Sequence, residues 1–287
     1  MALAALSGDE QGILFSQLCN VLDPGIAVAL SSVSNELWVL THALRQQLRA
    51  DHEAAAALCH KLGMGSCKEL REAKMVSWWN KGLTAADLGV LGTLGSVLPA
   101  LEKLRLYNSA AGPDGVQRLA EGLGAGALPA VTNFTLAMHV GDAGASALAA
   151  ALDRRALPRL KSLLLCSTAI GDAGLVALAP ALRRLPALET LVLGGNPFGD
   201  EGLAALVAPP PPAGALSPAT GALAKLKLLD LSNTRFSARR RSTSGNLAWV
   251  ASRLEPWQEP KSLRQWQRRE QCPPDYPDIP LLHVEFM

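Results

Sequence analysis

Four segments of this 287-residue chain repeat one pattern, and that repetition constrains the fold more than any other feature of the sequence. In each segment, apolar residues at relative positions 1, 4 and 6 precede a Gly-x-x-Gly pair, and further apolar residues follow that pair. The segments are 98–123, 128–152, 157–182 and 185–208, and the segment 223–236 repeats only the first half. The first glycines of the pairs, Gly112, Gly141, Gly171 and Gly199, are 29, 30 and 28 residues apart. A period of this length is typical of a solenoid, in which each unit stacks on its neighbours.

Each unit is predicted to be a strand, a turn and a helix. Leu160, Leu163 and Leu165 have the alternation of a strand with one buried face. Leu178 and Leu182, four and eight residues after the second glycine, have helical spacing. Between them, an aspartate in the Gly-Asp-x-Gly turns, as at residues 172 and 200, is expected to cap its own helix.

The repeated unit resembles the leucine-rich repeat of the ribonuclease-inhibitor subtype. The likeness lies in the L-x-x-L-x-L core and in the polar residue at relative position 9, here Ser109, Thr168, Asn196 and Thr234. The resemblance implies an α/β fold: a short solenoid with parallel strands inside and helices outside, preceded by a small helical module. The second unit lacks one residue around Met138-His139, so its turn is expected to be irregular.

Both ends of the repeat array differ from its centre. Residues 70–97 are interpreted as a degenerate capping repeat, with Leu70, Met75 and Trp78 supplying a strand and a helix following Thr84. The Pro-rich stretch 208–222 is predicted to be an insertion between the fourth helix and the fifth strand. Residues 237–287 are predicted to be an irregular or disordered tail. Either residues 246–270 cover the last strand as a helix, or a mis-spliced or frame-shifted gene has shortened the array.

Residues 10–62 have helical spacing and no repeat match. Asp23-Pro24 is expected to end one helix and start a second, and a third is predicted over 42–62. The run 14–40 resembles an F-box, which implies docking on a Skp-type adaptor of a cullin ubiquitin ligase. The residues that the resemblance assigns to the adaptor are Phe15, Leu18, Leu22, Pro24 and Trp38. The alternative is a helical cap that buries Phe15, Leu18 and Trp38 against the first repeat.

Composition indicates neither catalysis nor a polyanionic partner. The chain has 27 Lys and Arg against 25 Asp and Glu, which gives no electrostatic reason to expect nucleic acid or a membrane as partner. Five scattered cysteines and no signal-peptide pattern favour the cytoplasm, or the nucleus. No nucleophile and base can be placed together, and no cofactor is expected. A metal site at His52, Cys59, His60 and Cys67 is disfavoured, because zinc ligands are paired at short spacings on a turn.

The strand face opposite the helices is therefore the predicted binding surface, and the protein is predicted to be a non-catalytic interaction scaffold that binds a protein partner. Strand alternation assigns to this concave face Lys103, Arg105, Tyr107, Asn133, Thr135, Ser162, Cys166, Thr190 and Asp230, together with Leu164, Val192, Leu228 and Ser232. The scaffold is interpreted as a substrate receptor of a ubiquitin ligase. Alternatives are a Ran-type GTPase-activating regulator, which uses the same repeat subtype, and a truncated repeat protein without retained activity.

Overall fold

The computed structural model describes residues 10, 13, 15, 19–33, 35–107, 110–206, 223, 225–235 and 283–285. Leu18, Ser109, the Pro-rich stretch 208–222 and all of the predicted tail except 283–285 lie outside the described residues. The predicted alternatives for 246–270 therefore also fall outside them.

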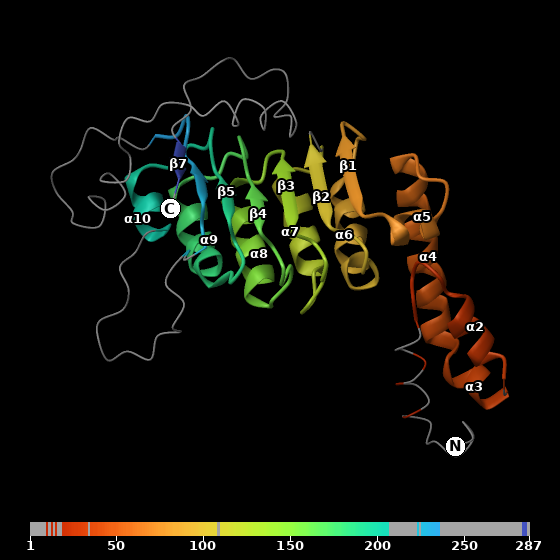
Figure 1. The fold of residues 1–287 in the computed structure, drawn as a ribbon. Coiled ribbons are helices and arrows are strands. Elements are labelled where there is room, and N and C mark those ends of the chain that lie inside the picture. The colour runs from red at the N-terminus through yellow and green to blue at the C-terminus, as the bar shows by residue number, and fades with distance from the viewer. Residues whose placement is uncertain are drawn as a thin grey trace, which may run out of the picture.

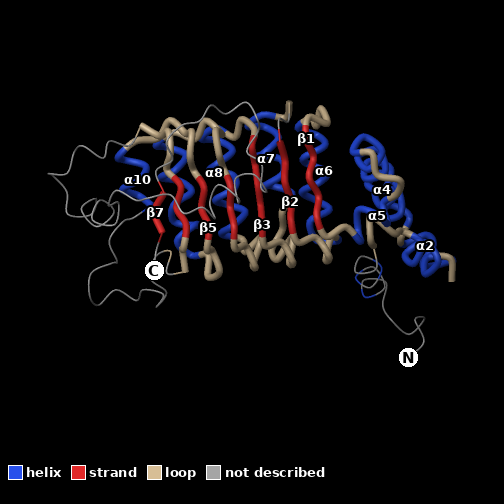
Figure 2. The backbone as a smooth tube through the Cα atoms, turned by 45° about the horizontal axis from the view of Figure 1, so that its top comes forward, coloured by secondary structure: helices blue, strands red, loops and turns tan. Residues whose placement is uncertain are grey.

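One sheet runs through the repeat array (Figures 1 and 2). Its strands follow one another in chain order and the first six are parallel. They are β1 (Met75–Trp79), β2 (Lys103–Tyr107), β3 (Asn133–Ala137), β4 (Ser162–Leu164), β5 (Thr190–Val192) and β6 (Leu228–Asp230). Every connection from β1 to β5 passes through a helix on the same face of the sheet, as stacking of repeated units requires.

Helices form a second layer on one face of the sheet (Figure 1). They are α6 (Ala85–Thr93), α7 (Gly112–Gly122), α8 (Gly141–Asp153), α9 (Asp172–Arg184) and α10 (Asp200–Leu206), and the 3-10 turn η2 (Leu94–Val97) extends α6. The core lies between the layers. The residues at relative positions 1, 4 and 6 of all five units are buried there, from Leu101, Leu104 and Leu106 to Leu226, Leu229 and Leu231. The predicted α/β solenoid fold is confirmed.

A buried asparagine joins the third and fourth units. Asn196 is 1% exposed, and its Oδ1 accepts hydrogen bonds from the amide and hydroxyl of Thr168 (3.1 and 3.0 Å) and from the amide of Ile170 (3.0 Å). Its Nδ2 donates to the carbonyls of Leu165 and Leu193, both at 2.7 Å. One side chain therefore satisfies backbone groups of two neighbouring units, where water cannot reach them.

Asp142 and Asp172 cap the following unit and not their own helix, so the sequence prediction was wrong for Asp172. Asp172 is the first residue of α9, and its Oδ1 accepts hydrogen bonds from the amides of Gly199 (2.8 Å) and Gly202 (2.7 Å) in the next unit. Asp142 likewise accepts from the amide of Gly171 at 2.7 Å. The reason is spatial: stacked helices bring each carboxylate beside the free amides of the next helix start, where negative charge is favourable.

The turn of the second unit, which lacks one residue, is hydrogen-bonded to the third unit. The amides of Val140 and Gly141 both donate to the carbonyl of Thr168, each at 2.9 Å, and Gly141 takes the left-handed φ of +63°. Glycine adopts that conformation without strain. The helix α8 begins at Gly141, just as α7 begins at Gly112, which has a φ of +57°.

Within residues 70–97, β1 and α6 have the order of a repeat, but the alternation differs from the prediction. Val76 and Trp78 are buried, whereas Met75 is 57% exposed and lies in register with Lys103 on the face opposite the helices. The assignment of Met75 to the core side was therefore wrong. Leu70 is buried, but it belongs to the short helix α5 (Cys67–Glu72) and not to the strand.

The N-terminal helices extend away from the repeats (Figure 1). They are α2 (Gly25–Ser31), which follows Pro24, α3 (Asn35–Leu40) and α4 (His42–Leu62), which has the expected range and ends at Gly63 with φ +79°. At 21 residues, α4 is about 30 Å long. Its C-terminal part contributes Leu58 and Leu62 to the repeat core, and its other end carries α2 and α3.

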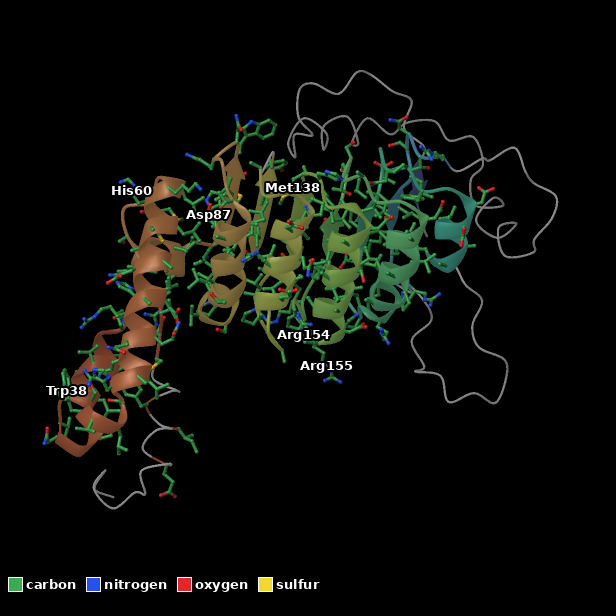
Figure 3. The ribbon with its side chains drawn as sticks, turned by 180° about the vertical axis from the view of Figure 1, so that it is seen from behind. Trp38, His60, Asp87, Met138, Arg154 and Arg155 are labelled. Carbon is green, nitrogen blue, oxygen red and sulfur yellow. The ribbon has the colours of Figure 1, made fainter. Side chains whose placement is uncertain are left out.

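The length of α4 keeps Phe15 and Trp38, two residues of the proposed helical cap, away from the first repeat. Phe15 is fully buried, but it packs with Ala27 and Leu48 in a cluster apart from the repeat core. Trp38 is 43% exposed at the far end of α4, whereas His60 lies near the repeats (Figure 3). The alternative that buries Phe15 and Trp38 against the first repeat is therefore wrong.

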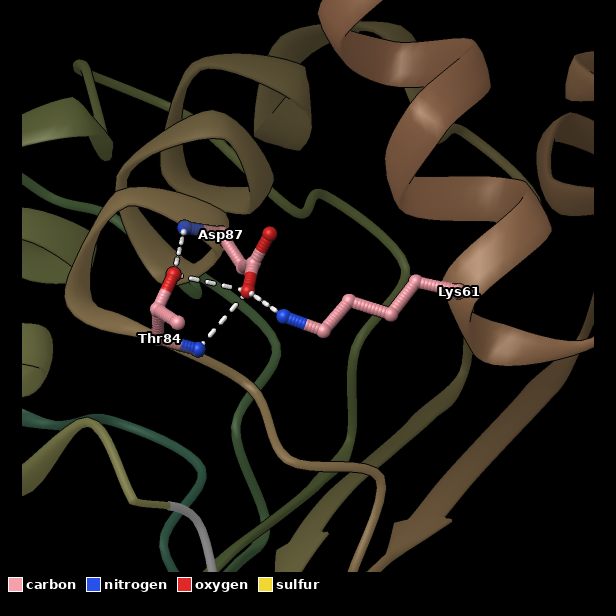
Figure 4. Close-up of polar contacts among 3 residues, drawn as sticks. All are labelled: Lys61, Thr84 and Asp87. Atoms are coloured by element: carbon pink, nitrogen blue, oxygen red, sulfur yellow. Dashed lines mark hydrogen bonds and ion pairs between the residues drawn. The ribbon is translucent and has the colours of Figure 1, made fainter.

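A polar contact joins α4 to the first repeat helix (Figure 4). The Lys61 Nζ lies 2.5 Å from Asp87 Oδ2, which also accepts from the Thr84 amide (2.7 Å) and hydroxyl (2.8 Å). Thr84 Oγ1 in turn accepts from the Asp87 amide at 3.3 Å, which completes a capping box at the start of α6. Partial burial acts to raise the pKa of Asp87, but the bonds from Lys61 and Thr84 outweigh it, and that pKa lies below its ordinary value.

The last parallel strand has an antiparallel neighbour that the sequence did not predict. The strand β7 (His283–Glu285) pairs with β6 in the register Leu228 with 285, Leu229 with 284 and Asp230 with 283. Three residues from near the end of the chain thus cover the edge of the sheet that the half unit leaves open.

Candidate protein-binding face

We call the sheet face opposite the helices the open face. Strand register arranges its side chains in rows that cross the sheet. One row consists of Met75, Lys103, Asn133, Ser162, Thr190 and Leu228, and the next of Ser77, Arg105, Thr135, Leu164, Val192 and Asp230. A third row begins with Trp79, Tyr107 and Ala137. The register brings the strand residues predicted from the sequence together on this face, and it adds the side chains of β1.

Exposure on the open face is uneven. Lys103, Arg105, Asn133 and Thr190 are half-buried, as is Cys166 just after β4. Tyr107, Thr135, Ser162 and Asp230 are buried. Asp230 also uses its Oδ1 to accept from the Ser232 amide at 2.8 Å. The half-buried side chains offer most of the area that a partner could contact.

The sequence analysis missed the contribution of β1 to this face. Trp79 is 40% exposed, and its ring lies 5.1 Å from the ring of Tyr107, centroid to centroid, at an interplanar angle of 34°. Aromatic pairs at this separation attract each other. Aligning Val76 and Trp78 with Leu104 and Leu106 would have found the right alternation, because both pairs point into the core.

Charge on the open face is concentrated on one strand. Lys103 and Arg105 on β2 are cationic, Asp230 on β6 is acidic, and the described open-face positions on β3, β4 and β5 carry no charged side chain. At the N-terminal edge of the strands, Lys227 Nζ lies 2.6 Å from Glu189 Oε2, which lowers the pKa of Glu189. Both residues directly precede their strands, so the pair lies at the ends of β5 and β6 and not in the rows of the open face.

A second surface lies on the N-terminal helices. Its side chains are large, apolar and at least 40% exposed, and they comprise Ile26, Val28, Val33, Trp38, Val39, Leu40 and Leu44. We call these residues the N-terminal apolar surface. The Arg45 guanidinium carbon lies 3.4 Å from the centre of the Trp38 ring, and Arg45 Nη2 donates to the Trp38 carbonyl at 2.6 Å. Seven exposed large apolar side chains within residues 26–44 make this region a candidate interaction site.

The residues predicted to bind an adaptor differ in how deeply they are buried. Phe15 and Leu22 are buried, Pro24 is half-buried beside the start of α2, and Trp38 is exposed. Of these, Trp38 belongs to the N-terminal apolar surface, Phe15 packs in the separate cluster with Ala27 and Leu48, and Leu22 belongs to the cluster that includes the repeat core.

The histidines, cysteines and acidic residues of the described part of the chain form no metal site. No group of three or more His, Cys, Asp or Glu side chains among them could hold a metal ion. Burial, together with the neighbouring Cys67, raises the pKa of the Cys59 thiol to about 12, so it is protonated at neutral pH. His52, one of the residues considered as a metal ligand, has its Nδ1 2.7 Å from the carbonyl oxygen of Val21.

Comparison with known families identifies the class of this fold. A family model described as Leucine Rich repeat matches residues 185–207, which contain β5 and α10. Together with the six parallel strands, this match shows a leucine-rich-repeat solenoid, a class that generally binds other proteins. No curated protein matches the chain. Among the described residues, no helix is long and apolar enough to cross a membrane.

Proposed function

We propose that this protein is a non-catalytic scaffold that holds a protein partner on the open face of its sheet. The observation that carries the proposal is the register, which gathers side chains of six successive strands on one face that no described helix covers. Such a face binds through shape and a few anchoring side chains. The family match at residues 185–207 supports the same reading.

Two double variants, each of which adds two positive charges, test this proposal. Asn133→Arg with Thr190→Arg places two long cations on the open face, where both residues are half-buried. Gln117→Arg with Val176→Arg places the same charge on exposed positions of α7 and α9. Proteins captured in cells by the tagged full chain, and quantified by mass spectrometry, should be lost from the first variant and kept by the second. Equal retention by both variants refutes the open face as the binding site.

A second candidate function concerns the N-terminal helices. The F-box resemblance supports an adaptor-binding role, in which a Skp-type adaptor connects the protein to a cullin ubiquitin ligase and the repeats hold its target. The specific observation in its favour is the N-terminal apolar surface, which lies at the end of α4 away from the repeats. A partner there would leave the open face accessible.

Direct binding of the full chain to a purified Skp-type adaptor tests this role by calorimetry. Val33→Asp with Val39→Asp should abolish binding, because both side chains are 66% exposed and their replacement disturbs no core contact. Ala54→Asp with Ala57→Asp, on exposed positions of α4, is the matched control and should bind as the wild type does. Absence of wild-type binding would remove the ligase interpretation and leave the open-face proposal intact.

A further inference from the structure

The outer edge of β1 has no partner strand in the part of the chain that the structure describes. Among the described strands, β1 comes first in the sheet and has β2 as its neighbour. At the opposite end of the sheet, the short antiparallel strand β7 pairs with the outer edge of β6. An edge such as that of β1 can bind an extended peptide, which then continues the sheet.

Three residues of β1 turn their backbone groups toward this outer edge. The Lys74 carbonyl accepts a hydrogen bond from an amide of β2 at 3.0 Å, and the Asn80 amide donates to a carbonyl of β2 at 3.4 Å. Because successive residues of a strand point their backbone groups to opposite sides, the even-numbered residues between these two also face β2. The amides and carbonyls of Met75, Ser77 and Trp79 point the other way and are placed to bond a further strand.

The side chains of β1 also indicate an open edge. Met75 and Trp79 are 57% and 40% exposed and Ser77 is exposed as well, whereas the open-face side chains of β2 to β6 are half-buried or buried. The segment Met75–Trp79 contains no proline, glycine or charged residue, although such residues commonly protect a bare edge from pairing. Its valine and tryptophans instead favour strand pairing.

The helix α4 limits what can occupy this edge. It packs beside α6, where Lys61 contacts Asp87, and so takes the place beyond α6 in the helix layer (Figures 1 and 4). A second copy of the chain that continued the sheet would need this space for its own helices, because each strand of a solenoid is backed by a helix. A single extended segment needs only the sheet layer.

From this geometry we infer that β1 binds an extended segment of a protein partner as an antiparallel strand. In such a pairing, every second residue exchanges both backbone bonds with the residue opposite, so the first, third and fifth residues of the segment meet Trp79, Ser77 and Met75. The first and fifth lie beside exposed apolar side chains and are apolar themselves. The second and fourth face the helix side, where α4 lies, and are small. This site is separate from the rows of the open face.

Selection of random 12-residue peptides displayed on phage against the full chain supplies the probe. Enriched peptides should share two large apolar residues four positions apart, with small residues at the second and fourth positions of that stretch. In a synthetic enriched peptide, methylation of the backbone nitrogen of the first, third or fifth residue should weaken binding about 10-fold or more. Methylation at the second or fourth residue should not, because those amides point away from β1.

Two variants of the full chain test the same edge. Ser77→Pro removes an amide that points away from β2, and proline is tolerated on the bare side of an edge strand, so this variant should fold but lose binding. Ser77→Ala keeps the amide, is the matched control and should bind as the wild type does. Circular dichroism checks that both variants fold. If Ser77→Pro does not fold, the N-methylation pattern still decides.

Four outcomes would overturn the inference. They are the absence of enriched peptides, N-methylation effects without alternation, full binding by folded Ser77→Pro, and a full chain that sediments as a dimer and becomes monomeric on that substitution. The last outcome would assign the edge to a second copy. If Asn133→Arg with Thr190→Arg abolishes peptide binding while Ser77→Pro does not, the peptides bind the open face and the edge of β1 has no role.

Discussion

Replacing Asn196 tests whether one buried side chain holds neighbouring repeats together. Asn196→Ala leaves the amides of Thr168 and Ile170 and the carbonyl of Leu193 without the partner they have now. Each buried group without a hydrogen bond costs about 1–3 kcal/mol. The expected loss of unfolding free energy is therefore at least about 3 kcal/mol, a large part of the 5–15 kcal/mol typical of a domain.

Equilibrium unfolding in urea, followed by circular dichroism, measures this loss. Asn133→Ala is the control, because the same change on the open face removes only an acceptor for the Thr132 hydroxyl (2.9 Å). It should cost less than about 0.5 kcal/mol. Asn196→Thr should lie between the two, since Thr168 shows that a threonine at this position can still donate to a carbonyl of its own unit.

Solenoids can unfold in parts, so a second probe is needed. Tryptophan fluorescence sums the signals of six tryptophans, among them Trp78, which is buried in β1, whereas circular dichroism reports on all helices. Asn196→Ala should shift the circular dichroism transition to lower urea, even if the fluorescence transition moves less. A loss below about 1 kcal/mol, or one equal to that of Asn133→Ala, would refute the role given to this hydrogen-bond network.

Three further predictions concern contacts between units. Gly174→Ala should destabilise by about 1–3 kcal/mol in urea unfolding, because its Cβ would lie 2.4 Å from the Asp142 carboxylate, whereas Gly124→Ala, with open space around it, should not; equal effects would contradict the close approach. Asp87→Asn should cost about 1 kcal/mol at pH 7. Its lowered pKa stabilises the fold above the unfolded value of about 3.9, so this difference from the wild type should vanish as pH falls through the folded pKa, and a difference independent of pH would contradict it. Arg154→Met should lower the melting temperature by a few degrees, because Arg154 Nη2 donates to two carbonyls at the end of α7 (2.7 and 3.2 Å; Figure 3); an unchanged melting temperature would show that these bonds contribute nothing.

The repeat core could be predicted because its signal is local and is repeated. Leu160, Leu163 and Leu165 are spaced as a strand with one buried face, and every unit repeats that spacing. Stacking is then the one way to cover the apolar faces. The helical range 42–62 followed from the same kind of spacing. The single unmatched unit containing β1 offered no such repetition, and Met75 was assigned to the wrong face.

The tertiary structure decided what depends on the distance between units. The sequence shows that an aspartate stands in each Gly-Asp-x-Gly turn, but only stacking shows that Asp172 serves the amides of the next helix. In the same way, the sequence contains Trp79 and Tyr107 as separate residues 28 positions apart, and the register of β1 and β2 makes them one pair. Periodicity is a property of the chain and can be read along it. Contacts across units depend on how the units stack, which short-range spacing does not encode.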